Sequence, residues 1–354
     1  MRHERLWPWA ARAGLFFISI GARPPPPSPP TLSLALSPSF SASTAGLLAL
    51  AASSPLPAPA GEIAESKKVR KTIKKENLTT FQKSAIRAEL LTRADGALRA
   101  ELTSEDAPSA VRLVLVDVAG YDPATRTGGV DGSAVLFEAN TPAVKALAPY
   151  IAKLKKAKDA IDGQARPGQD PISWADLEIL GARAALSKAF REAKLNNGGN
   201  AQSVAAMKSD FPVLIGRVDA AAGPGAGRGA ATLPAPGADA DAIISFFDRL
   251  GKKADGSNPT GGRSLMWEKP AFYAWGASLP SGAAAAEEAR LSAANSVFAA
   301  AKVAADRSRA TASRSDYEVD VADLLMRLGS SKAGATFDPE AYQHDVVVES
   351  VKLS

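Results

Sequence analysis

Histidine and cysteine, the side chains that most often bind metals or move protons near neutral pH, are almost missing from this chain. There is no cysteine, and the two histidines are His3 and His344. The lack of thiols excludes disulfides, thiolate zinc sites and cysteine nucleophiles. We expect His3 to be removed with an N-terminal leader and His344 to be a surface residue near the end of the chain. No serine–histidine hydrolase triad is therefore predicted.

Two further patterns could carry chemistry. Four carboxylates lie between positions 316 and 323, but on a helix they spread around more than one face, and the first two fit a capping box that begins at Ser315. The glycine-rich segment 223–229 superficially resembles a phosphate loop, yet no Lys-Ser/Thr pair follows it and no strand precedes it. We expect no metal site and no phosphate loop.

The first 60 residues have the composition of a targeting leader. They hold four arginines and one acidic residue, with a proline run at 23–30 followed by serines and threonines, which is typical of organelle transit sequences. An apolar stretch at 45–52, too short to span a bilayer, precedes an Ala-x-Ala site at 58–60. We predict that residues 1–60 are a chloroplast transit and lumen-transfer peptide cleaved after Ala60. The alternative is an Ala/Pro/Ser tail without a targeting role.

This leader also explains most of the positive charge. Residues 1–60 carry three of the five net positive charges, so the mature chain, residues 61–354, is nearly neutral and predicts no nucleic-acid partner. It retains no stretch that could serve as a transmembrane anchor. Six Lys and Arg residues fall within positions 67–75, in a basic N-terminal segment 61–78. That run is either a solvated face or a contact with an acidic partner or the negative membrane surface.

Local patterns predict a helix-rich chain. Helices are predicted over residues 81–91, 173–190, 239–250, 283–306 and 315–328. The start at Ser173 is a capping-box-like sequence with Asp176 in the place of Glu or Gln. The last of these helices turns an apolar face, beginning at Val319, inward and stops at Gly329. On β-propensity alone, Val111–Val118 predicts a strand.

Several motifs resemble those of plant-type haem peroxidases of the ascorbate class. Val111–Asp122 is similar to the family's distal segment L-R-L-A-W-H-D-A-G-T-Y-D, and Thr127–Ser133 to T-G-G-x-N-G-S. Pro171–Leu177 is similar to P-I-S-Y-A-D-L, and Gly216–Asp219 to G-R-x-D. The resemblance runs over roughly residues 80–345 and implies an all-α fold, with a helix instead of a strand at 111–118. It implies one peroxidase-like helical domain in two packed halves over residues 61–354.

Within this family the chain is similar to the thylakoid lumen ascorbate-peroxidase-like proteins of plants and algae. The residues that carry this closer resemblance are Gly198–Asn200, Ser313–Asp320, Phe337 and Glu340–Tyr342. It agrees with the lumen location predicted from the leader. It also implies association with photosystem II or with the thylakoid membrane surface.

The resemblance places the haem-site positions one by one. Arg112 matches the distal arginine, whereas Leu115 stands where the family has a tryptophan and Val116 where it has the distal histidine. Asn140 is a candidate match for the asparagine that orients this histidine. Gly282 replaces the aspartate that would hold the proximal imidazole. No stretch resembles the proximal histidine motif, although residues 255–263 fall near its expected place, and Arg112 is left to bind an anion or to pair with a carboxylate.

A haem peroxidase needs one histidine on the iron and a second one to move the proton of peroxide. We therefore expect a haem-less protein of the thylakoid lumen with no cofactor and without efficient peroxidase turnover. One alternative is an ascorbate-type haem peroxidase that reduces hydrogen peroxide in the oxidative stress response. A second alternative is a protein that binds ascorbate or another small molecule without turnover.

Overall fold

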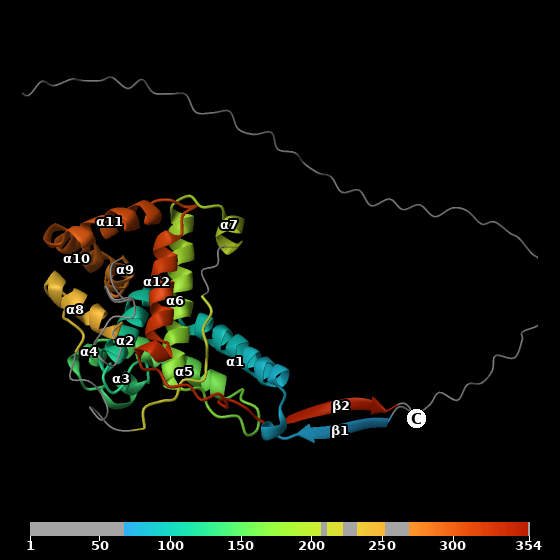
Figure 1. Ribbon diagram of the computed structural model, residues 1–354. Helices are drawn as coiled ribbons and strands as arrows, with labels where there is room; N and C mark the ends of the chain where they lie inside the picture. Colours follow the sequence, from blue (N-terminus) through green and yellow to red (C-terminus); the bar gives the residue numbers. More distant parts are fainter. Residues whose placement is uncertain (1–66, 207–210, 222–231, 252–268, 353–354) are drawn as a thin grey trace, which may run out of the picture. The chain divides into compact units, whose positions relative to one another are not determined.

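The computed structural model describes residues 67–206, 211–221, 232–251 and 269–352, and their fold is all-α, as predicted, apart from one two-stranded ribbon (Figure 1). The α-helices are α1 (Thr80–Glu101), α2 (Ala107–Ala119), α3 (Ser133–Phe137), α4 (Pro142–Lys145), α5 (Ala148–Asp162), α6 (Trp174–Asn196), α7 (Ala201–Ala206), α8 (Ala240–Leu250), α9 (Lys269–Ala277), α10 (Ser281–Ala294), α11 (Ser296–Arg309) and α12 (Asp316–Leu328). Short 3-10 turns, η1 (Lys75–Asn77), η2 (Ser104–Asp106) and η3 (Ser331–Ala333), lie between them, and the strands are β1 (Lys67–Ile73) and β2 (Val346–Lys352).

Several helices begin where local signals placed them. Ser173 caps α6 by accepting a hydrogen bond from the Asp176 N–H at 3.1 Å, and α8 follows its amphipathic pattern. The β-branched segment 111–118 is helical, as the family resemblance implied. Nearly every side chain of α2 is buried, so packing outweighs the β-propensity of its valines.

Two local predictions were wrong in detail. The helix expected over residues 283–306 is divided, because Asn295 ends α10 and caps α11 by accepting from the N–H groups of Val297 at 2.9 Å and Phe298 at 3.2 Å. The capping box expected at Ser315 does not form, since Ser315 makes no side-chain cap hydrogen bond. Glu318 instead points inward, and Val319, expected inward, is 50% exposed.

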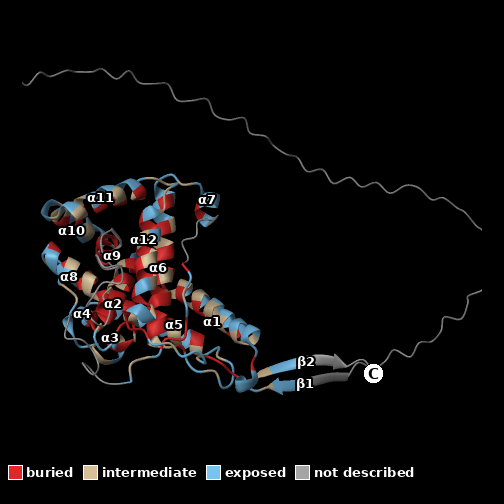
Figure 2. Cartoon of the chain, in the orientation of Figure 1, coloured by how far each residue is buried: buried red, intermediate tan, exposed pale blue. Residues whose placement is uncertain are grey.

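The helices pack in two groups that share a centre, as the expected two halves require. α1 packs on α5 and α6, while α9 packs on α10, α11 and α12. α2 contacts α6 of the first group and both α9 and α12 of the second. Buried residues gather where α2, α6 and α12 meet (Figure 2). Any site built on α2 therefore lies at the junction of the two groups.

The basic run forms an element that the sequence did not predict. β1 and β2, from opposite ends of the described chain, pair as an antiparallel ribbon in which Arg70 faces Glu349 (Figure 1). Arg70 Nε lies 2.7 Å from a Glu349 carboxylate oxygen, and Lys74 Nζ lies 2.8 Å from Asp345. These ion pairs and the strand hydrogen bonds hold the ribbon together.

Chain contacts divide the protein into two units, residues 1–63 and 64–354. The first unit lies outside the described residues, so the predicted leader and its cleavage after Ala60 remain predictions. Within the described residues, no helix combines the length and apolar character that crossing a membrane requires.

Candidate functional site

Helix α2 places the three predicted distal positions on one face. Arg112, Leu115 and Val116 are spaced i, i+3 and i+4, so they are neighbours on the helix surface. Leu115 is fully buried and Val116 almost so. Where the family has an indole and an imidazole, this face offers hydrocarbon side chains that neither accept nor donate a proton.

Among the described residues, Arg112 is held by packing and by one hydrogen bond. Its guanidinium lies 5.3 Å from the centre of the Trp275 ring, a cation–π arrangement, and Nη2 donates to the Pro234 carbonyl at 3.3 Å. No described residue forms a hydrogen bond with the buried Nη1. Burial lowers the pKa of Arg112, but the group stays protonated at any physiological pH. Among the described residues no carboxylate pairs with it, so the alternative of an ion pair finds no support there.

The other predicted site residues lie at the surface. Asn140 is exposed in the turn between α3 and α4. Gly282 is exposed in the first turn of α10, where a Cβ would meet only open space. The structure therefore does not bring these two residues to the buried face of Val116. Positions 255–263, near which the proximal motif was expected, lie outside the described residues.

His344 is buried, not a surface residue as expected. It is 8% exposed, and its Nδ1 lies 2.9 Å from the Asp345 carbonyl oxygen. The reason is the neighbouring Tyr342, which anchors the C-terminal segment in the core. Within the described residues, no three His, Asp or Glu side chains group as metal ligands would.

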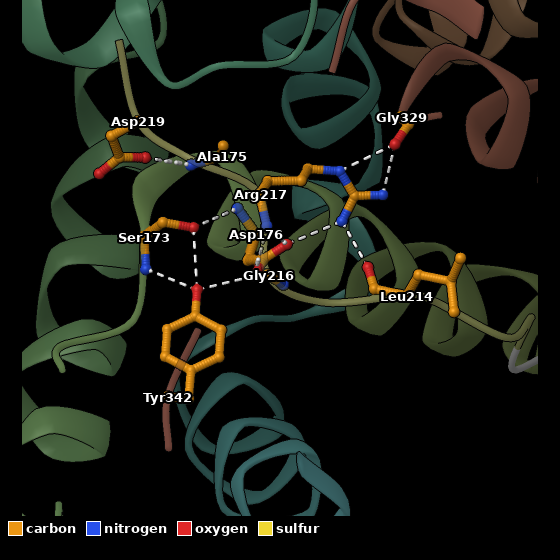
Figure 3. A network of polar contacts seen from close by, with 9 residues as sticks. All are labelled: Ser173, Ala175, Asp176, Leu214, Gly216, Arg217, Asp219, Gly329 and Tyr342. Carbon is orange, nitrogen blue, oxygen red and sulfur yellow. Dashed lines mark hydrogen bonds and ion pairs between the residues drawn. The ribbon is translucent and has the colours of Figure 1, made fainter. Parts of the chain in front are cut away.

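The motifs that carry the family resemblance meet in a buried polar network (Figure 3). Asp176, at the start of α6, accepts from the Gly216 N–H at 2.6 Å and pairs with Arg217 Nη1 at 2.8 Å. Arg217 Nε donates to the Gly329 carbonyl at the end of α12, at 2.9 Å. Arg217 also lies over the Phe337 ring, with 4.8 Å to the ring centre. One ion pair therefore joins α6, the 214–219 segment and α12.

Tyr342 closes this network from the C-terminal side (Figure 3). Its hydroxyl donates to Asp176 Oδ2 at 2.7 Å and accepts from the Ser173 N–H at 3.1 Å. Burial and the Asp176 charge raise the pKa of Tyr342, so the phenol stays neutral. Asp219 accepts from the first N–H groups of α6, those of Trp174 at 3.0 Å and Ala175 at 2.9 Å. These contacts of Tyr342 and Asp219 join segments of the chain to one another.

The glycine-rich motif 127–133 is organised in the same way around Asp117. This carboxylate, fully buried on α2, accepts from the N–H groups of Asp131, Gly132 and Ala134, each at 2.8 Å. Gly129 has a positive φ of 98°, and a Cβ there would collide with the 333–335 backbone. The motif is glycine-rich because the loop packs backbone to backbone.

Two buried ionisable side chains were missed by the sequence analysis. Glu178 on α6 is fully buried, and no described donor reaches either of its oxygens. Burial, and then the charge of Asp117, raise its pKa well above the ordinary value. Lys194, also fully buried, pairs with Glu318 at 2.9 Å and donates to the Ser308 carbonyl at 2.9 Å. The sequence feature that could have indicated them is an ionisable residue on an otherwise apolar face of a helix.

The chain was then compared with known proteins. The peroxidase family pattern matches residues 91–255. The tomato (Solanum lycopersicum) protein named "Thylakoid lumenal 29 kDa protein, chloroplastic" is 31% identical over 272 residues, which cover 71% of this chain and 72% of that protein. The crystal structure of the TL29 protein from Arabidopsis thaliana superposes with a TM-score of 0.60 at 23% identity, covering 74% of this chain and 99% of that one. The chain belongs to the peroxidase family, of which the tomato protein is a relative, and is a protein of the chloroplast thylakoid lumen.

Proposed function

We propose that this protein is a haem-less member of the peroxidase family that attaches to photosystem II in the lumen and does not turn over peroxide. The observation that carries the proposal is the face of α2, where Leu115 and Val116 stand beside Arg112. Residues of this kind do not fit a haem iron. The iron needs an imidazole ligand, and peroxide cleavage needs a proton carrier opposite it. Arg112 can stabilise negative charge but cannot shuttle a proton, because it stays protonated.

The absorbance spectrum of the purified protein, before and after adding one equivalent of haem, tests this part of the proposal. We expect only the spectrum of loosely associated haem, and no ascorbate-dependent consumption of hydrogen peroxide above that of free haem. An ascorbate peroxidase with both histidines serves as the positive control. A sharp stoichiometric Soret band with ascorbate oxidation would establish the rival function, a haem peroxidase.

Attachment to photosystem II is supported by the basic ribbon. Arg70 and Lys74 are engaged in ion pairs within it, but Lys71 and Lys75 are exposed and have no ion pair among the described residues. These two ammonium groups, unpaired among the described residues, lie on β1 and on the η1 turn that follows it, and both can meet an acidic surface. Because such exposed charges are screened within about 8 Å at physiological salt, attachment by them should weaken as salt rises.

Salt washes of photosystem II-enriched membranes test the attachment. Lys71→Gln/Lys75→Gln should be released at lower salt than the wild type. The matched control, Lys145→Gln/Lys156→Gln, removes two exposed lysines of α4 and α5 and should wash off like the wild type. Equal release of all three forms would mean that the ribbon charges are only solvated. A further test is binding to anionic vesicles that contain no protein. If the protein binds these vesicles as well as it binds the membranes, its partner is the lipid surface and not photosystem II.

Ascorbate binding is a second candidate, and one observation favours it. The buried Nη1 of Arg112 has no hydrogen-bond partner in the part of the chain that the structure describes, and a buried donor without an acceptor favours an anion that can accept from it. Calorimetric titration with ascorbate should then show binding that Arg112→Met abolishes. Absence of heat with the wild type would dismiss this candidate.

A further inference from the structure

A cavity of about 530 Å³ opens at the first turn of α2, one turn before Arg112, which does not line it. Its α2 wall is made by Ala107 and Pro108, in the first turn of that helix. One side wall is a stripe of α6: Leu186, Ala189, Phe190 and Ala193. The facing stripe of α10 is Ser281, Ala284, Ala285 and Glu288. Both stripes follow the i, i+3, i+4, i+7 spacing of a single helix face.

The small side chains of these two stripes explain why the space between them stays open. α10 packs on α9 and α11, which fix its position. Its side toward α6 carries the methyl groups of Ala284 and Ala285, and the facing side of α6 carries those of Ala189 and Ala193. Methyl groups on both sides cannot fill the gap between two helices that are held apart. Ala193, Ser281 and Ala285 of its lining are exposed, so the cavity is open to solvent and a ligand can enter it, and its apolar walls favour an apolar occupant.

The polar end of the cavity is closed by charges that neutralise one another. Arg309 Nη1 and Nη2 donate to the two carboxylate oxygens of Glu288 at 2.9 and 2.6 Å, and Nη2 also reaches Asp306 at 2.8 Å. Lys302 pairs with Asp306 at 2.5 Å. The guanidinium further lies 5.0 Å from the centre of the Tyr317 ring. Two cations and two carboxylates satisfy each other, so an incoming ion finds no free counter-charge.

We propose that this cavity binds a neutral, largely hydrocarbon small molecule. The walls offer apolar surface, which favours a hydrocarbon ligand over water. The volume lies within the range of ordinary ligand pockets. A charged ligand such as a carboxylate would have to break the Arg309–Glu288 pair or remain unpaired in an apolar site, and both are unfavourable. Arg112, Leu115 and Val116 do not line this site, so the inference does not depend on the function proposed above.

Fluorescence titration of the full chain with the neutral dye N-phenyl-1-naphthylamine tests the proposal. We expect saturable binding of one dye per chain. Ala284→Phe, which puts a ring into the cavity from α10, should weaken binding about tenfold or more. Ala189→Phe does the same from α6 and serves if the first variant fails to fold. The matched control is Ala286→Phe, an exposed position on α10 that does not line the cavity, and it should bind as the wild type does.

Displacement of the dye decides the chemical class of the ligand. Decanol should displace it at lower concentration than decanoate, since the two have the same chain length but differ in charge. Stronger displacement by decanoate would overturn the inference of a neutral ligand. Absence of saturable dye binding, or equal binding by Ala284→Phe, Ala189→Phe and Ala286→Phe, would overturn the site itself.

Discussion

Glu178 should make the protein less stable as pH rises, and Glu178→Gln should remove this dependence. The carboxyl group is fully buried on α6 and receives no hydrogen bond from a described donor. Its protonated form can donate to Asp117, which an ionised form could not do. The Tyr150 hydroxyl is another buried group without a hydrogen-bond partner among the described residues, and its neutral phenol supplies no positive charge to stabilise an ionised Glu178. Glutamine keeps the size of the group and its ability to donate, while it cannot ionise.

The sign and the magnitude follow from linkage. Burial raises the pKa of Glu178 in the folded chain well above its ordinary value of 4.5. The stability that its proton contributes is therefore fully present below about pH 4.5 and is lost as pH rises toward the folded pKa. Each pH unit in that window is worth about 1.4 kcal/mol. From pH 5 upward the wild type should therefore lose stability relative to Glu178→Gln, by at most about 1.4 kcal/mol for each pH unit.

Urea denaturation followed by circular dichroism, at half-unit steps from pH 4.5 to pH 8, measures this difference. Comparing variants at each pH cancels the contributions of the other carboxylates, which both chains share. Glu192→Gln, an exposed position on the same helix, is the matched control and should change the free energy of unfolding by less than about 0.5 kcal/mol. A difference between wild type and Glu178→Gln that does not vary with pH would refute the reasoning, as would a less stable glutamine variant at pH 7.

Three further predictions concern the polar network around Asp176 and the face of α2 that carries Arg112 and Val116. Asp176→Ala should lower the free energy of unfolding by about 3–5 kcal/mol in urea denaturation, because it leaves the buried Arg217 without its carboxylate; a loss under about 1 kcal/mol would mean that water replaces the partner. Tyr342→Phe removes one hydrogen bond to the same carboxylate and should cost about 2 kcal/mol in the same assay; an unchanged denaturation midpoint would contradict this. Val116→His should create no ascorbate peroxidase activity in a steady-state assay with added haem, because an iron ligand would still be missing, and measurable turnover would show that another residue anchors the iron.

The sequence by itself determined the elements that depend on neighbours along the chain. Ser173 caps α6, and α8 follows an amphipathic stripe, because capping and helical periodicity act over three or four residues. The short motifs were sufficient to identify the family and, through it, the helix at 111–118. The absence of histidine from α2 is likewise a fact of the sequence, and so is the expectation about haem chemistry that follows from it.

Only the tertiary structure decided what the motif residues do. Asp176 looked like a reciprocal capping residue and Glu318 like another, yet each pairs with a buried cation far away in the chain, Arg217 and Lys194. A carboxylate at the start of a helix can accept a hydrogen bond from a nearby backbone N–H or pair with a distant cation. The sequence does not show which of these two interactions is the more stable. Burial decides between them, because an unpaired buried cation destabilises the fold by more free energy than a missing helix cap does.

The same reason governs the parts that no pattern indicated. β1 is a strand because its partner β2 lies at the other end of the chain, with Lys74 and Asp345 separated by 271 positions. His344 is buried because Tyr342 beside it is anchored at Asp176. The cavity exists because alanines of α6 and α10 face each other across a gap that α9 and α11 hold open. Local patterns fix which residues form a helix, whereas the partners of its buried faces and charges are set by segments that meet only in the folded chain.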